Sequence, residues 1–75
     1  MPYVNIKITR EGATPEQKAR LIREVTRLLS DLLGKNPQTT VVVIDEVEND
    51  NWGIGGETVT VRRERERRKG VPGQG

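Results

Sequence analysis

Pro2 is the residue of this sequence best suited to acid–base chemistry, because it can become the N-terminal residue. Its small side chain permits removal of Met1, which leaves a free secondary amine in a rigid ring. An α-amino group ordinarily has a pKa of about 7.7–8.0, and burial or a nearby cation lowers that value toward neutrality. A base poised near neutral pH suits proton transfer. Taken alone, Pro2 equally fits a proline that only starts a strand.

Few other groups offer comparable chemistry, since the sequence has no histidine and no cysteine. Asp45 and Glu46 could pair, but adjacent residues of a strand point to opposite faces, which favours simple charges at a strand end. The segment 52–56 is rich in glycine, yet it lacks the Lys-Ser/Thr of a phosphate-binding loop and no helical pattern follows it. We interpret its glycines as residues that allow a tight turn.

Basic residues are concentrated in the segment Arg62–Lys69, whereas the preceding part of the chain is mildly acidic. Such a segment can bind nucleic acid or another polyanion. This one contains no aromatic residue for stacking on bases, and its charges are of mixed sign, which favours a solvated segment. We therefore predict a single domain over residues 1–63 and a basic, flexible tail over residues 64–75.

The elements that would position Pro2 follow from the periodicity of the sequence. Apolar and polar residues alternate over residues 3–9, which indicates a half-buried strand. Thr14 and Gln17 fit a capping box at the start of a helix, and apolar residues then recur every three or four positions. Gly34 stands where a C-terminal cap belongs, so we predict a helix over about residues 15–33.

The second half of the sequence predicts one long strand and one short one. The unbroken β-branched run within residues 39–47 indicates a strand buried on both faces, as in a parallel sheet. Strand, helix and strand in this order form a right-handed βαβ unit. A polar turn at residues 48–51, the glycine-rich loop and a short strand over residues 58–61 follow. From Arg62 on, the chain is too polar to pack.

The chain is poorly equipped to fold as a stable monomer. It has 75 residues, of which 32% are hydrophobic and none is phenylalanine. Without cysteine or histidine it can form no disulfide, and a structural metal is not expected. Small domains without such supports commonly oligomerise, so we expect several copies to share a core. No segment has the long apolar run of a membrane span or the charged and apolar pattern of a secretory signal, and we expect a cytoplasmic location.

These motifs together resemble the 4-oxalocrotonate tautomerase family. The resemblance covers about residues 2–63, and its most specific element is Trp52-Gly53-Ile54-Gly55-Gly56-Glu57, at a fixed spacing from Pro2. It also includes Glu16–Lys18, Leu21–Val25, Val42–Ile44 with Glu46, and Arg62-Arg63. Pro2 alone is unspecific, but together with this motif it favours a catalytic base over a residue that only starts a strand.

The resemblance implies an α+β fold in which a βαβ unit is followed by a short C-terminal hairpin. Two copies would form a four-stranded sheet with two helices, and three such dimers a homohexamer. Pro2 would be the catalytic base, in an apolar pocket, with Trp52 as an aromatic wall supplied by a neighbouring chain. Backbone groups of Ile8 and Thr9 would approach the substrate. No cofactor or metal is implied.

The sequence departs from the family where two arginines usually grip the substrate's carboxylates. Ala13 and Val41 occupy those positions, and neither side chain can replace a bidentate guanidinium. One extra residue before Gly12 places Arg10 at the end of the first strand. We predict that Arg10 is the substitute anion-binding residue, with Lys7 a weaker candidate.

The function implied is that of a cofactor-independent isomerase resembling 2-hydroxymuconate tautomerase, an activity of aromatic hydrocarbon catabolism. It would move a proton within a small enol or keto acid. Ile54 stands where some dehalogenase relatives carry an acidic residue, which favours a tautomerase over a hydrolytic dehalogenase. Two alternatives remain open: a non-catalytic or partner-dependent subunit of a hetero-hexamer, and polyanion binding by Arg62–Lys69. Neither nucleic acid nor a membrane is an expected partner.

Overall fold

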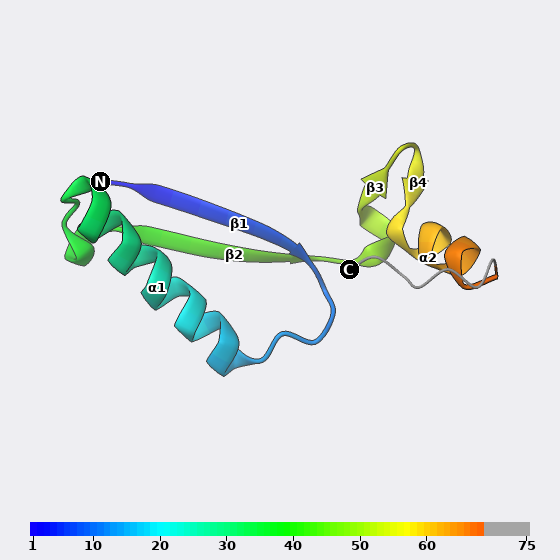
Figure 1. Ribbon diagram of the computed structural model, residues 1–75, viewed down its shortest axis with the longest axis horizontal. Coiled ribbons are helices and arrows are strands. Elements are labelled where there is room, and N and C mark those ends of the chain that lie inside the picture. The colour runs from blue at the N-terminus through cyan, green and yellow to red at the C-terminus, as the bar shows by residue number, and fades with distance from the viewer. Residues whose placement is uncertain (69–75) are drawn as a thin grey trace.

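The computed structural model describes residues 1–68 and contains the predicted strand–helix–strand unit. β1 (Tyr3–Thr9) and β2 (Val41–Val47) are parallel and paired in register along their whole length. α1 (Pro15–Leu33) connects them, and a short 3-10 turn, η1 (Pro37–Thr39), precedes β2 (Figure 1). The α+β fold class predicted from the sequence is confirmed.

α1 begins and ends where the sequence predicts. The Thr14 hydroxyl accepts a hydrogen bond from the Gln17 N–H (3.1 Å), and the Gln17 side-chain oxygen accepts one from the Thr14 N–H (2.9 Å). Gly34 ends the helix at φ 65°, a left-handed conformation that glycine adopts readily, and its N–H donates to the Ser30 carbonyl (3.0 Å). Local signals are therefore sufficient to define this helix.

The two faces of the sheet have different partners. Glu46 forms an ion pair with Lys18 of α1, so the face of β2 that carries Glu46 is the one that α1 covers. On the opposite face, Asp45 accepts hydrogen bonds from the side chains of Asn5 (2.8 Å) and Lys7 (2.9 Å). The predicted separation of Asp45 and Glu46 onto opposite faces is confirmed, and each carboxylate has a structural partner.

The part of the chain after β2, which we call the C-terminal arm (residues 48–68), contains the predicted short hairpin and, in addition, a helix that was not predicted. A 3-10 turn, η2 (Asn49–Asn51), leads into an antiparallel hairpin of β3 (Gly53–Ile54) and β4 (Glu57–Thr58). A helix, α2 (Val59–Arg68), follows directly. The arm projects from the end of the sheet opposite to the N terminus (Figure 1).

The strand predicted over residues 58–61 is wrong after Thr58. The Val59 N–H donates to the Trp52 carbonyl (2.8 Å), and the Thr58 hydroxyl accepts from the Val61 N–H (3.1 Å), as a helix N-cap does. The first bond completes the hairpin, and the Thr58 cap then favours the helix over the strand preference of the β-branched run, because propensity is a weak determinant beside specific contacts. The expectation that no helix follows the glycine-rich loop is also wrong.

Residues 62–68 are also more ordered than their polarity predicts. Residues 62–68 are helical, and Glu64 forms ion pairs with Arg67 (2.7 Å) and Arg68 (3.6 Å), three and four positions along α2. Pairs at this spacing support a helix. The division into a domain of residues 1–63 and a flexible tail of residues 64–75 stays a prediction, and residues 69–75 lie outside the described part.

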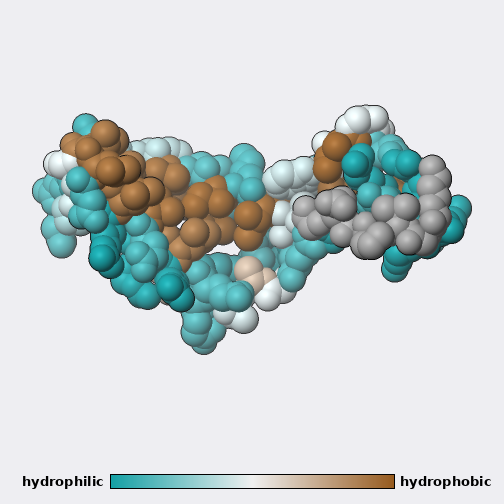
Figure 2. All heavy atoms as spheres, in the orientation of Figure 1, coloured by the Kyte–Doolittle hydropathy of each residue, from teal (hydrophilic) through white to brown (hydrophobic). Residues whose placement is uncertain are grey.

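Few side chains are buried within one chain. Among the described residues only Val59 is buried, while Leu28, Leu32 and Leu33 of α1 are 54%, 73% and 63% exposed. Val41, predicted to lie in a strand buried on both faces, is 43% exposed. Figure 2 shows hydrophobic residues as a continuous band along the sheet and α1. An apolar surface of this kind is typical of an interface.

The overall dimensions lead to the same conclusion. The molecule measures 48 × 24 × 19 Å and has a Cα radius of gyration of 16.3 Å. A compact chain of this length would have a radius of gyration of about 11 Å. The sheet and the C-terminal arm therefore do not pack into one globule within a single chain.

Candidate functional site

The residues that the sequence singles out lie at opposite ends of β1. Pro2 immediately precedes the strand, and its carbonyl accepts a hydrogen bond from the Val41 N–H (3.0 Å). Thr9 ends the strand, about 20 Å away along an extended backbone. Because Trp52 lies at the Thr9 end, a single chain does not bring Pro2 and Trp52 together.

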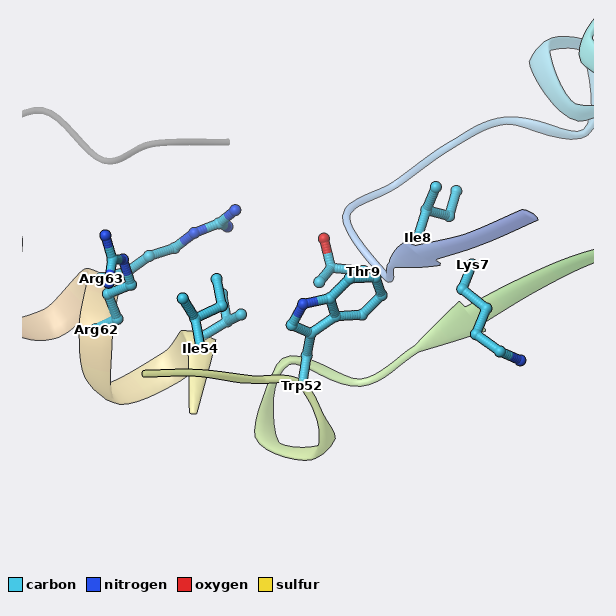
Figure 3. Close-up of a pocket in the computed structure, with 8 residues that line it drawn as sticks. Lys7, Ile8, Thr9, Trp52, Ile54, Arg62 and Arg63 are labelled. Atoms are coloured by element: carbon cyan, nitrogen blue, oxygen red, sulfur yellow. The ribbon is translucent and has the colours of Figure 1, made fainter. Parts of the chain in front are cut away.

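A pocket of about 400 Å³ opens at the Thr9 end, between β1 and the C-terminal arm. Its walls combine apolar side chains with three cations. The lining residues are Lys7, Ile8, Thr9, Trp52, Ile54, Val59, Arg62 and Arg63. In Figure 3, Trp52 and Ile54 lie between the two arginines of α2 and the end of β1. Ile8, Thr9 and Trp52 are thus brought together, as predicted site residues, while Pro2 and Arg10 are not part of this pocket.

Two sets of backbone hydrogen bonds position Trp52. One set lies within the C-terminal arm, and the other joins the ends of β1 and β2. The Trp52 carbonyl accepts from the N–H of the buried Val59 (2.8 Å), which closes the hairpin around the start of α2. At the strand ends, the Arg10 N–H donates to the Val47 carbonyl (2.8 Å). The ends of β1 and β2 therefore stay paired up to the point where the arm begins.

Arg10 is held away from the pocket by an ion pair. Its Nε lies 2.6 Å from a carboxylate oxygen of Glu48. The two strands end side by side, so the residue after β1 necessarily lies near the residue after β2. Arg10 instead lines a separate hollow together with Glu48 and Asp50, and these acidic neighbours disfavour the binding of an anion there.

A bidentate ion pair ties the β1–α1 loop to α2. Arg63 donates from both terminal nitrogens to Glu11, with Nη2 3.0 Å from Oε2, and the Thr9 hydroxyl also donates to this carboxylate. The Arg63 guanidinium and the Thr9 hydroxyl lower the pKa of Glu11 to about 2. The same pair raises the pKa of Arg63 above its ordinary value. The positive charge that Arg63 brings to the pocket wall is therefore neutralised by Glu11.

The other two pocket cations differ in their partners. Lys7 lies 2.9 Å from Asp45, whose pKa is lowered by its hydrogen bonds from Asn5 and Lys7. Arg62 forms no ion pair with a carboxylate of residues 1–68. A pocket with net positive charge, a tryptophan and aliphatic walls can hold a small organic anion that has an apolar part.

Sequence reasoning did not identify Arg62 and Arg63 as pocket residues. A strand ending at residue 61 and a solvated tail would leave both side chains in water, whereas α2 begins at Val59 and places both against the pocket. The available signal was Thr58, a hydroxyl residue two positions after Gly56 and therefore a good helix cap.

Other kinds of site find no support in the part of the chain that is described. Over residues 1–68, no three His, Cys, Asp or Glu side chains are grouped so that they could hold a metal ion. No helix there has the length and apolar character needed to cross a membrane.

Comparisons with known proteins match nearly the whole described chain. The family model described as "Tautomerase enzyme" matches residues 2–62. "Probable tautomerase K2" of Dickeya dadantii is 70% identical over 64 residues, which cover 85% of this chain and 96% of the relative. "2-hydroxymuconate tautomerase" of Bacillus subtilis is 35% identical over 60 residues, with 80% and 97% covered. The crystal structure of DmpI from Helicobacter pylori superposes with a TM-score of 0.79 at 46% identity, covering 84% of this chain and 97% of that one.

Proposed function

The chain belongs to the tautomerase family, and we propose that it is a cofactor-independent isomerase in which Pro2, freed by removal of Met1, is the general base. Its substrate is a small enol or keto acid, such as a 2-hydroxydienoate or a 2-oxo acid. One observation carries the proposal: a short chain combines a proline at position 2 with a pocket of cations and apolar side chains. The substrate named for the Bacillus subtilis relative supports this chemical class.

The reaction moves a proton and leaves the substrate's composition unchanged. The Pro2 amine takes a proton from the hydroxyl of a dienol, or from the carbon beside a carbonyl, and the bonding electrons enter the conjugated system. The protonated amine then returns the proton to a different atom of the conjugated system, a carbon for the dienol or the carbonyl oxygen for the keto acid. Apolar surroundings favour the neutral, basic form of the amine. Cations at the substrate's oxygens stabilise the negative charge that develops in the transition state.

The active site requires more than one copy of the chain. Pro2 and the pocket are separated by the length of β1, about 20 Å along an extended backbone. Trp52, Ile8 and Thr9 would therefore contact a substrate held at the Pro2 of another copy, with Trp52 as the aromatic wall. The exposed leucines of α1 supply the apolar surface for such an assembly, and a homohexamer is the proposed form.

The decisive experiment compares three preparations on phenylpyruvate and 2-hydroxymuconate. The first has Met1 removed, the second is Pro2→Ala, and the third keeps an uncleavable N-terminal extension that turns the proline nitrogen into a non-basic amide. Loss of a general base typically costs about 10²–10⁴-fold in rate, so we expect losses of this size in the second and third preparations. Mass spectrometry must establish the N terminus of each. Equal activity in all three would refute the proposal.

A partner-dependent subunit is the second candidate, and the apolar residues Ala13 and Val41 favour it, because another chain could supply the missing arginines. Native mass spectrometry of the purified protein separates the two candidates. A homohexamer that is active by itself supports the self-sufficient enzyme. An inactive protein that gains activity only with a second chain would support the subunit.

A further inference from the structure

The proposed substrate carries a carboxylate, and the chain must bind it without the two arginines that Ala13 and Val41 replace. Four cations lie at or near the Thr9 end of β1: Lys7, Arg10, Arg62 and Arg63. Their ion pairs distinguish them, because a cation already bound to a carboxylate must give up that partner before it can bind an anion.

Three of the four cations are already paired. Arg10 is paired with Glu48, at 2.6 Å, and lies outside the pocket. Arg63 is held in a two-point contact by Glu11, and Lys7 lies 2.9 Å from Asp45. Each pair neutralises the charge that an incoming carboxylate would use.

Arg62 is the exception within the described chain. It lines the pocket from the first turn of α2, is half-buried, and forms no ion pair with any carboxylate of residues 1–68. Glu66 lies four positions along α2, at a spacing that allows pairing, but no ion pair joins it to Arg62. A guanidinium offers the planar donor pair that matches a carboxylate.

We propose that Arg62 is the anion-binding residue of this pocket and takes the carboxylate of a small aryl or conjugated acid, whose apolar part lies against Trp52. The pocket combines this free guanidinium with the tryptophan ring and the aliphatic Ile54 and Val59. The inference deepens the proposed function, on which it relies only for calling the bound anion a substrate. It replaces Arg10, the residue predicted from the sequence, in that role.

Binding can be measured without any reaction, because Trp52 is the only tryptophan of the chain. The probe is 3-phenylpropanoate, an unreactive carboxylate of the proposed class, and its uncharged amide serves as the matched ligand. Titration of Trp52 fluorescence in the full-length protein gives the dissociation constant of each. Repeating the titration in Pro2→Ala tests binding separately from catalysis, since loss of activity there leaves the expected binding unchanged.

We expect Arg62→Ala to weaken binding of 3-phenylpropanoate by about ten- to a hundredfold, the usual effect of losing a hydrogen-bonded charge. Binding of the amide should change little. Arg62→Lys should recover only part of the affinity, since a lysine keeps the charge but not the planar pair of donors. Arg68→Ala is the control on the same helix outside the pocket, and it should stay within about twofold of the wild type.

Steady-state kinetics with phenylpyruvate gives an independent measurement. Arg62→Ala should raise KM much more than it lowers kcat, as expected for loss of a contact present in both ground and transition states. Unchanged binding of 3-phenylpropanoate in Arg62→Ala would overturn the inference. So would an equal loss for the amide, or a larger loss of carboxylate binding in Arg10→Ala than in Arg62→Ala.

Discussion

Under the proposed function, the two ends of β1 carry different parts of one active site. Pro2, the proposed base, stands before the first residue of the strand, next to the exposed Val41 of β2. The other end carries Trp52 and the cations of the pocket. Seven residues of extended backbone keep the halves apart, and no bend within one chain can join them while β1 stays paired with β2. Under the proposed function, assembly of copies would complete the site and would also bury the apolar surface.

A complementation experiment tests whether the Pro2 of one copy and the Trp52 of another serve the same site. Trp52→Ala and a form with a blocked Pro2 amine should each lose about 10²-fold or more of the activity. Refolded together, they should regain activity, because some sites combine an intact Pro2 of one copy with an intact Trp52 of another. Random mixing in equal amounts restores about a quarter of the sites.

The control for complementation is the same mixing with each inactive form alone. Activity that rises only in the mixed sample shows that the two ends act between copies. If the mixed sample stays as inactive as its components, while native mass spectrometry shows mixed oligomers, Pro2 and Trp52 of different copies do not form a common site.

The next largest effect concerns the surface that joins the copies. Leu28 of α1 is 54% exposed in one chain, so a polar residue there should cost the monomer little. If Leu28 is buried between copies, Leu28→Ser should cost about 2–5 kcal/mol at each contact and dissociate the oligomer. Size-exclusion chromatography measures the assembly, and activity should fall with it. Arg20→Ser, on the polar face of the same helix, is the matched control and should leave the assembly intact.

The sequence predicts the elements that depend on local signals. Thr14, Gln17 and Gly34 define α1 through hydrogen bonds within a few residues, and the alternation in residues 3–9 defines β1. The sequence does not predict α2, although the short hairpin before it is expected from the family resemblance. The Val59 N–H still completes the hairpin through the Trp52 carbonyl, and the Thr58 hydroxyl then caps the helix at the Val61 N–H, which strand propensity alone cannot reveal.

In the candidate site, too, some features could be predicted from the sequence and others could not. Trp52, Ile8 and Thr9 are predicted through the family motif and do line one pocket. For the predicted anion-binding residue, Arg10, the structure adds what the sequence does not reveal: Glu48 lies beside it in space, and Arg10 does not line this pocket. Its role stays a prediction. Which cation remains free depends on every ion pair around the pocket, and those pairs join positions up to 52 residues apart.

The ion pair between Glu11 and Arg63 at the pocket predicts a pH dependence of stability. The Arg63 guanidinium, helped by the Thr9 hydroxyl, lowers the pKa of Glu11 from 4.5 to about 2 in the folded chain. Because the folded pKa is the lower one, this pair stabilises the fold above about pH 4.5, and that contribution is lost as the pH falls toward 2. Glu11→Gln should therefore weaken the dependence of Tm on pH over this range, measured by thermal unfolding of both proteins.

At neutral pH, Glu11→Gln should also bind 3-phenylpropanoate more tightly, by about two- to fivefold, because Arg63 is released to act beside Arg62. Glu48→Gln is the matched control: it releases Arg10, which lies outside the pocket, and should leave the affinity unchanged. Tighter binding in Glu48→Gln than in Glu11→Gln would assign the anion to Arg10. The residue that binds the anion would then be Arg10, at the end of β1, instead of Arg62 in α2.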